Sequence, residues 1–138
     1  MSPPAAGGWI VDASVAVKWF KPASIEPDSD LARKAVATLS LKTTSLAYYE
    51  TGNVLGRAGQ TPGQVASNLG VMSEACGLPL ELTPEDFAVC AEIANEHRIT
   101  FYDASYVAIA RRLNRHVLSA DSDLLGPGLA SDLRTALG

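Results

Sequence analysis

The sequence predicts a single α/β domain built on a mostly parallel sheet. Short apolar stretches of strand length alternate along the chain with longer stretches in which apolar residues recur at helical spacing. Turn residues, as in "AGQTPG", separate several of these stretches. The chain has 138 residues, which is the size of one domain. No fixed period recurs along it, so the alternation does not indicate a repeat protein.

The expected elements follow from apolar runs, caps and breakers. Strands or extended pieces are predicted at 9–13, 42–45, 77–83, 99–101 and 116–120. Helices are predicted at 14–20, from Ser29 or Asp30 to about 39, and at 46–57, 62–75, 84–98, 102–114 and 129–137, with a loop or short helix at 121–128. The strongest helix start has Thr83 as N-cap, Pro84 at the first helical position and Asp86 at the third, which is a near capping box.

Composition is that of an ordinary soluble globular protein, with 47% hydrophobic and 19% charged residues. No apolar run approaches the ~20 residues of a membrane span. Residues 1–8 carry no basic residue before the first apolar stretch, so we expect a disordered lead-in, not a secretory signal, and a domain over 9–138. Cys76 and Cys90 form no CxxC motif and are expected to be small core residues in a reduced, cytoplasmic setting.

The net charge of −4, with a pI near 5.0, taken alone argues against a nucleic-acid binder, because such proteins usually carry a basic patch. The chain also has no GxxxxGK[ST] or GxGxxG phosphate loop. His97 lies at a helix end and His116 at the start of a strand, so neither is placed as a general base. These observations disfavour nucleotide-binding enzymes and ribonucleases that use a pair of histidines.

Three acids follow segments predicted to be strands. Asp12 and Asp103 each begin an Asp-Ala-Ser tripeptide, and Asp121 follows "HVLSA". Because ligands bind where the carboxyl ends of parallel strands meet, these side chains are expected to lie close together. Each could instead serve only as the N-cap of the helix that follows.

A fourth acid is predicted on a helix. Leu46, Glu50, Asn53 and Arg57 share one helical face, so Glu50 and Asn53 interrupt an otherwise apolar stripe that we expect to point inward. Alternatively, Glu50 is a solvated surface residue. If all four acids converge, they repel one another by roughly 4 kcal/mol per pair at 4 Å, so they require cations or some of them must be protonated. Oxygen ligands without Cys or His favour Mg²⁺ or Mn²⁺, and such ions suit phosphodiester hydrolysis.

Four motifs, "IVDASVAVKWF", "YYETGNVL", "ITFYDASYVAIA" and "LSADSDLL", resemble in order and spacing the PIN-domain nucleases, and most closely the VapC-type toxins of prokaryotic toxin–antitoxin pairs. The resemblance covers about residues 9–125. It implies a three-layer α/β/α sandwich with a mostly parallel four- or five-stranded sheet, although the tail looks helical where the family has its last strand. It further implies a metal-dependent endoribonuclease that uses one or two ions.

The resemblance also assigns residues and partners. The catalytic and metal-binding acids are Asp12, Glu50, Asp103 and Asp121. Ser14, Asn53 and Ser119 match polar positions that would orient the acids or the water around the metal, and Asp123 is an additional candidate acid. An RNA substrate, a small cognate antitoxin and a homodimer are expected, with no membrane.

Two other interpretations remain open at this stage. The first is a catalytically silent PIN-like module that binds only RNA or protein. The second is another metal-dependent phosphate enzyme, or a phospho-accepting receiver domain, but Asp12-Ala-Ser lacks the DxD of such phosphatases, and "HVLSADSD" offers no receiver lysine.

Overall fold

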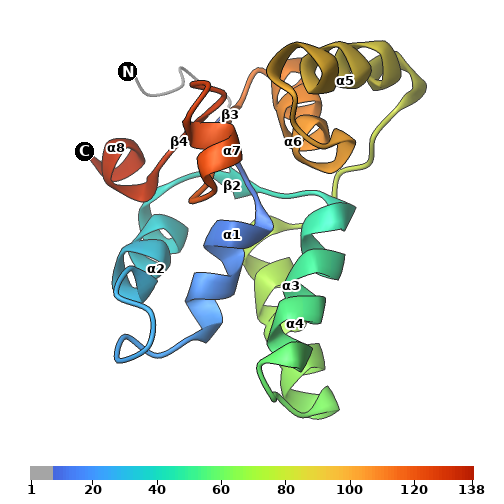
Figure 1. Cartoon of the computed structure of the whole chain (residues 1–138). Coiled ribbons are helices and arrows are strands. Elements are labelled where there is room, and N and C mark those ends of the chain that lie inside the picture. The colour runs from blue at the N-terminus through green and yellow to red at the C-terminus, as the bar shows by residue number, and fades with distance from the viewer. Residues whose placement is uncertain (1–7) are drawn as a thin grey trace.

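The computed structural model describes residues 8–138 as a helix-rich α/β fold around a four-stranded parallel sheet (Figure 1). Residues 1–7, and with them most of the predicted lead-in, lie outside the described part. The strands are β1 (Trp9–Val11), β2 (Leu41–Lys42), β3 (His116–Leu118) and β4 (Ala130–Ser131). The helices are α1 (Ala13–Ala16), the 3-10 helix η1 (Val17–Phe20), α2 (Ser29–Thr38), α3 (Ser45–Arg57), α4 (Pro62–Cys76), α5 (Pro84–His97), α6 (Phe101–Arg112), α7 (Ser122–Leu125) and α8 (Leu133–Leu137).

The sheet has the strand order β2-β1-β3-β4, and every neighbouring pair is parallel. Ile10 at the middle of β1 pairs with Lys42 on one side and Val117 on the other. Helices α5 and α6 lie on one side of the sheet, and α2 and α8 on the other (Figure 1). The predicted three-layer α/β/α arrangement with a mostly parallel sheet is therefore confirmed.

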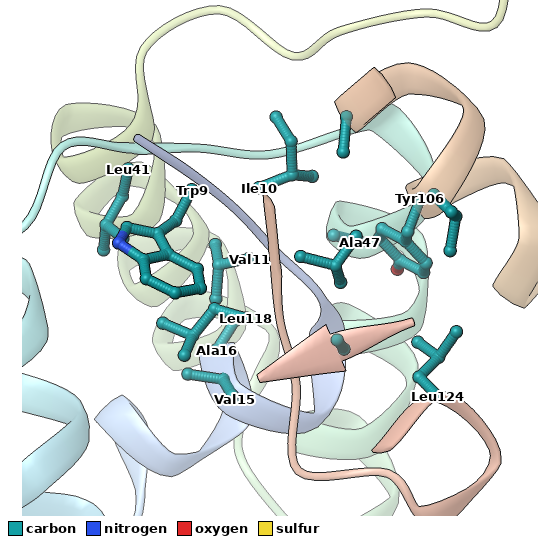
Figure 2. Close-up of a cluster of buried hydrophobic side chains, with 14 of the residues drawn as sticks. Trp9, Ile10, Val11, Val15, Ala16, Leu41, Ala47, Tyr106, Leu118 and Leu124 are labelled. Carbon is teal, nitrogen blue, oxygen red and sulfur yellow. The ribbon is translucent and has the colours of Figure 1, made fainter. Parts of the chain in front are cut away.

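The core is centred on β1, which is buried along its whole length, as parallel strands covered on both faces are. Ile10, Val11 and Leu118 of the central strands pack in one cluster with Val15 and Leu124 from the short helices that follow them (Figure 2). The stretch 104–110 of α6 is buried at every residue, because this helix lies between α5 and the sheet. Among residues 8–138, no helix combines the length and apolarity needed to cross a membrane.

Both cysteines occupy the positions that the sequence predicts. Cys76 at the end of α4 and Cys90 in α5 are buried and free, and Cys90 Sγ donates a hydrogen bond to the carbonyl of Phe101. Helix α5 begins as predicted, with a capping box formed by Thr83 and Asp86 and with Pro84 in its first turn. Asp86 also accepts a hydrogen bond from Arg112 at 3.0 Å, which links α5 to the end of α6.

The predicted strand at 77–83 is wrong. Only an isolated parallel bridge joins Leu80 to Thr44, with Leu80 N–H donating to the Thr43 carbonyl at 2.9 Å. Pro79, the residue before Leu80, has no N–H to extend a ladder. The segment therefore pairs at one residue with the chain just past β2 and does not add a fifth strand to the described sheet.

The predicted extended piece at 99–101 is also wrong. Helix α5 ends at His97, its C-cap Arg98 adopts a left-handed conformation with φ of 53°, and α6 begins at Phe101. Thr100 is the N-cap of α6 and accepts a hydrogen bond from the Asp103 N–H. With the helix end and the next cap so close, no residues remain for a strand.

The sequence predicts a helix over 129–137, but this tail is only partly helical. Ala130 and Ser131 form β4, and Ser119 N–H donates to the Ser131 carbonyl at 3.0 Å. Asp132 then caps α8 by accepting from the Thr135 N–H, which sets the helix start at Leu133. The last strand of the family pattern is therefore present, although it is only two residues long.

The entry of the chain into β1 depends on a glycine and an arginine. Gly8 has φ of +80°, and a Cβ there would come within 2.6 Å of the Ser40 carbonyl oxygen, so only glycine fits without a shift. The Arg115 guanidinium donates to the carbonyls of Trp9 and Ser40. These contacts fix the amino-terminal end of β1. They thereby also fix the position of Asp12, which follows its carboxyl end.

We predict that Leu118→Ala lowers the free energy of unfolding by about 2–4 kcal/mol, because Leu118 is fully buried in β3 and its loss leaves a cavity. Urea titration followed by circular dichroism measures the change. Val71→Ala on α4, where the side chain is 51% exposed, is the control and should stay within roughly 0.5 kcal/mol of the parent. Equal effects in the two variants would contradict the assignment of β3 to the core.

Candidate active site

A hollow of about 200 Å³ lies at the carboxyl ends of the two central strands. It is lined by the four predicted acids together with side chains of α1, η1, α3 and α6: Asp12, Ala13, Ser14, Val17, Glu50, Val54, Asp103, Tyr106 and Asp121. No Lys, Arg or His is among these lining residues. The structure thus brings together all four acids that the sequence singles out.

Asp12 directly follows β1, is only 3% exposed, and has hydrogen-bond partners on both carboxylate oxygens. Ser14 Oγ donates to Oδ1 at 2.6 Å, and Ser119 Oγ donates to Oδ2 at 2.5 Å. The Val15 N–H also donates to Oδ1, so Asp12 is the N-cap of α1 as well as a site residue. The capping interpretation and the site interpretation are therefore compatible at this position.

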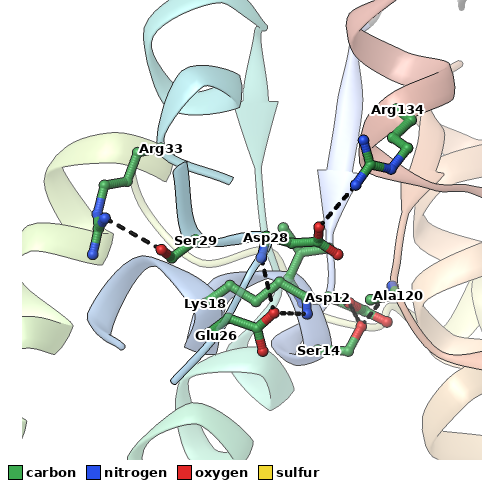
Figure 3. Close-up of polar contacts among 10 residues, drawn as sticks. Asp12, Ser14, Lys18, Glu26, Asp28, Ser29, Arg33, Ala120 and Arg134 are labelled. Atoms are coloured by element: carbon green, nitrogen blue, oxygen red, sulfur yellow. Dashed lines mark hydrogen bonds and ion pairs between the residues drawn. The ribbon is translucent and has the colours of Figure 1, made fainter. Parts of the chain in front are cut away.

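The two serines are themselves held by backbone groups. The Ala120 N–H donates to Ser14 Oγ at 2.8 Å, and the Asp121 N–H donates to Ser119 Oγ at 3.0 Å. Figure 3 shows Asp12 and Ser14 beside the chain at Ala120. Each hydroxyl accepts from the loop after β3 and donates to Asp12, so the loop sets the orientation of the carboxylate.

Burial raises the pKa of Asp12 to about 6. Hydrogen bonds from Ser119, Ser14 and Val15 oppose this change because they favour the charged form, whereas the nearby Asp121 adds to it. The carboxyl is thus mostly ionised at neutral pH and takes up a proton in mildly acidic solution.

Three further carboxylates form a cluster of their own. Asp103, Asp121 and Asp123 each offer one oxygen within 4.8 Å of the others. The pKa of Asp103 is raised, first by burial and then by the charges of Asp121, Glu50 and Asp123. Asp123, which the sequence offers only as an additional candidate, therefore belongs to the acidic cluster even though it is exposed.

Asp103 reaches the hollow by a different route from the one that the sequence predicts. It does not follow a strand and is not an N-cap; it lies in the first turn of α6, after the cap Thr100. Asp121, by contrast, is the N-cap of α7, and its side chain accepts from the Asp123 N–H at 3.0 Å. Ser105, in the second Asp-Ala-Ser tripeptide, donates to the Tyr102 carbonyl and does not line the hollow.

The predicted inward face of α3 is wrong, although Glu50 does reach the site. The buried residues of this helix are Ala47, Thr51 and Leu55, and Glu50 lies at the edge of that face. Asn53 and Arg57 are exposed and do not line the hollow. The buried stripe of α3 begins one residue later in the chain than the stripe that the sequence predicts, and this offset accounts for the difference.

Tyr106 is the site residue that sequence reasoning missed. Its side chain is 1% exposed, and its hydroxyl donates to Glu50 Oε1 at 2.7 Å. Burial and the negative charge of Glu50 raise the pKa of the phenol well above its ordinary value, so it stays neutral and remains a donor. Its position three residues after Asp103 on the same helix was the available signal.

The residues present fit a divalent metal ion. The donors are carboxylate oxygens, which favour a hard cation such as Mg²⁺ or Mn²⁺. The cluster of Asp103, Asp121 and Asp123 concentrates negative charge where no basic side chain lines the hollow. Lys18, a possible basic neighbour, instead forms an ion pair with Glu26 at 2.9 Å (Figure 3).

The fold and the site define a class: a parallel α/β sheet with carboxylates gathered at the carboxyl ends of its central strands. The family model for the PIN domain matches residues 9–126. Ribonuclease VapC3 from Pyrobaculum aerophilum is 32% identical over 123 residues, which cover 83% of the chain and 90% of that protein. The chain belongs to the PIN-domain family, and the resemblance in its four motifs is confirmed.

Solved structures agree on the fold. VapC20 from Mycobacterium tuberculosis, described as a sarcin-ricin loop cleaving toxin, matches with a TM-score of 0.72 at 17% identity, over 88% of this chain and 96% of that one. VapBC2 from Rickettsia felis, bound to a DNA fragment from its promoter, matches with a TM-score of 0.65 at 11% identity, over 90% of this chain and 96% of that one.

We predict that the metal-free protein becomes more stable as the pH falls from 7 towards 4.5. The pKa of Asp12 is near 6 in the folded state but near 3.8 in the unfolded state, so the folded state takes up the proton at higher pH. The buried negative charge therefore destabilises the fold in full only above pH 6, and this cost is lost as the pH falls. The parent should gain roughly 2 kcal/mol over this range, whereas Asp12→Asn, whose amide does not titrate, should show a flatter pH dependence. Urea titrations in EDTA at several pH values measure this. The exposed Asp30→Asn is the control, and a parent whose stability drops over this pH range would contradict the burial effect.

Proposed function

We propose that this protein is a metal-dependent endoribonuclease of the VapC type, the toxin component of a toxin–antitoxin pair. The observation that carries the proposal is the convergence of Asp12, Glu50, Asp103 and Asp121 on one hollow at the carboxyl ends of the central strands. Membership of the PIN-domain family and the similarity to Ribonuclease VapC3 support the reaction class. The carboxylate donors support Mg²⁺ or Mn²⁺ as the cofactor.

Asp103 and Asp121, with Asp12 and Glu50 beside them and Asp123 at the rim, would hold the cation. When bound, a divalent cation lowers the pKa of water and offsets the charge that develops on phosphoryl oxygens. Asp12 contributes a carboxylate whose direction is fixed, because Ser14 and Ser119 donate to its two oxygens. The serines act on the reaction only through Asp12, which keeps its charge at neutral pH despite its burial.

The negative charge of the hollow also affects how an RNA substrate would bind. The acidic hollow repels phosphate as long as its carboxylates are uncompensated, so binding of RNA and of cations should depend on each other. Arg57 is exposed on the same helix as Glu50 and is a candidate contact to the RNA backbone. The role of Asn53 stays a prediction, since its exposed side chain would need the bound RNA or a rotamer change to take part.

The proposed partners follow from the VapC type. A small antitoxin would hold the toxin inactive in the cytoplasm, and the fold similarity to VapBC2 supports a partner of that kind. A homodimer is expected as well. The surface to test is an apolar groove of about 380 Å³ between α3 and α6, where Tyr49, Phe101 and Tyr102 are 73%, 46% and 65% exposed.

We predict that Asp103→Asn abolishes metal-dependent cleavage of single-stranded RNA, lowering kcat by at least about 100-fold, because a ligand of the cation is lost. Cleavage of a labelled RNA is followed with Mg²⁺, with Mn²⁺ and with EDTA, and circular dichroism checks that the fold persists. Glu92→Gln, an exposed acid on α5, is the matched control and should cleave at the rate of the parent. Undiminished cleavage by Asp103→Asn, or equal cleavage in EDTA, would refute the assignment; a parent that binds RNA without cutting it would favour the silent module.

We predict that the protein is a dimer in solution and that Phe101→Glu shifts it towards the monomer by placing a charge in the apolar groove. Size-exclusion chromatography with light scattering at micromolar concentrations measures the mass. Phe87→Glu is the matched control, because Phe87 is similarly exposed at 52% but lies outside that groove. A monomeric parent would contradict the dimer, and a dimer insensitive to Phe101→Glu would exclude this groove as its interface.

A further inference from the structure

Glu50 is the one acid of the site that is carried by α3, and it depends on another helix for its orientation. A glutamate has three rotatable side-chain bonds, and Glu50 sits at the edge of the buried face of α3, where packing alone does not select its rotamer. Asp12, by contrast, is held through both oxygens by Ser14, Ser119 and the Val15 N–H. The position of Glu50 therefore needs an explanation of its own.

The explanation lies in Tyr106 on α6. Its hydroxyl donates to Glu50 Oε1 at 2.7 Å, which is the length of a strong hydrogen bond to a carboxylate. The ring is buried in the core beside Ala47, so the hydroxyl is a fixed point and not a mobile surface group (Figure 2). Since only one oxygen of Glu50 is engaged by the phenol, the other remains for a ligand in the hollow.

We propose that Tyr106 is a positioning residue that holds Glu50 in the orientation needed to bind a divalent cation together with Asp103 and Asp121. The inference rests on the proposed function, because it takes the hollow to be a metal site. Tyr106 itself has no role as a ligand here: its neutral oxygen donates to Glu50 and acts on the cation through that carboxylate alone. Removing the hydroxyl should leave Asp12, Asp103 and Asp121 in place but allow Glu50 to adopt several rotamers.

A double-mutant cycle tests the inference, with Mn²⁺ binding to the metal-free protein measured by calorimetry. The variants are Tyr106→Phe, Glu50→Gln and the two combined. Tyr106→Phe should weaken Mn²⁺ binding about 10-fold, as loss of a partner that orients a metal ligand does. Because the phenol acts through Glu50, the combined variant should bind Mn²⁺ no more weakly than Glu50→Gln alone.

Tyr48→Phe is the matched control. Tyr48 lies on α3, and its hydroxyl donates to the Gly77 carbonyl at 3.3 Å, away from the hollow, so the same atom is removed without touching the site. This variant should keep the Mn²⁺ affinity of the parent. In RNA cleavage, Tyr106→Phe should lower kcat with little change in KM, because the residue does not contact the substrate.

Glu50→Asp provides a second route if Tyr106→Phe fails to fold. It keeps the charge and the buried ring but withdraws the carboxylate by one methylene from the phenol, and it should lose Mn²⁺ affinity to a similar extent. An unchanged Mn²⁺ affinity in Tyr106→Phe overturns the inference, and so does an unchanged affinity in Glu50→Asp if only that variant folds. A loss of affinity in the combined variant equal to the sum of the single losses also overturns it. A parent that binds no Mn²⁺ overturns the proposed function, and the inference falls with it; a parent that binds Mn²⁺ with additive losses overturns the inference alone.

Discussion

The rest of the site depends on the burial of one carboxylate at the end of β1. An ionised carboxylate away from water is costly unless several donors compensate for the lost hydration. Asp12 obtains those donors from two directions: the Val15 N–H from the helix that begins after it, and two serine hydroxyls, one of which comes from the neighbouring strand end. The parallel pairing of Val11 with Leu118 is what brings Ser119 beside Asp12. Strand order, helix start and loop conformation are therefore all constrained by the need to satisfy this group.

The same constraint shapes the electrostatics of the site. Lys18, which follows Asp12 in the chain, pairs with Glu26, and Arg112 and Arg115 form their contacts at the ends of α6 and β1 away from the acids of the site. The acidic cluster is left with no basic residue lining its hollow. An internal arginine in that place would stabilise the fold but would also occupy the position of a cation. The protein instead retains repelling carboxylates, a cost that binding of a metal ion would offset.

How much could be predicted from the sequence is clearest in the two Asp-Ala-Ser tripeptides. Both acids reach the hollow as predicted, but Asp12 is an N-cap after a strand, whereas Asp103 lies in the first turn of α6. Ser14 supports the acid of its own tripeptide, while Ser105 bonds to its own helix. Local patterns located the acids, the amphipathic helices and the capping box at Thr83. They failed at the segments 77–83, 99–101 and 129–137. In these segments the choice between strand, turn and helix depends on which neighbouring backbone groups are free to pair, and an apolar run carries no information about those groups.

The relation between α3 and α6 is a further case of information that local patterns do not contain. Helical spacing places Glu50 at the edge of the buried face, and an error of one position turned that edge into an apparent inward stripe with Asn53 and Arg57. The same spacing places Tyr106 on the side of α6 that carries Asp103, but an aromatic residue in a continuously buried stretch looks like core alone. Only when the two helices are packed together does its hydroxyl meet Glu50. Tyr106 thus fills the core with its ring and reaches the acidic hollow with its oxygen, and such a residue is found by following each buried polar atom to its partner.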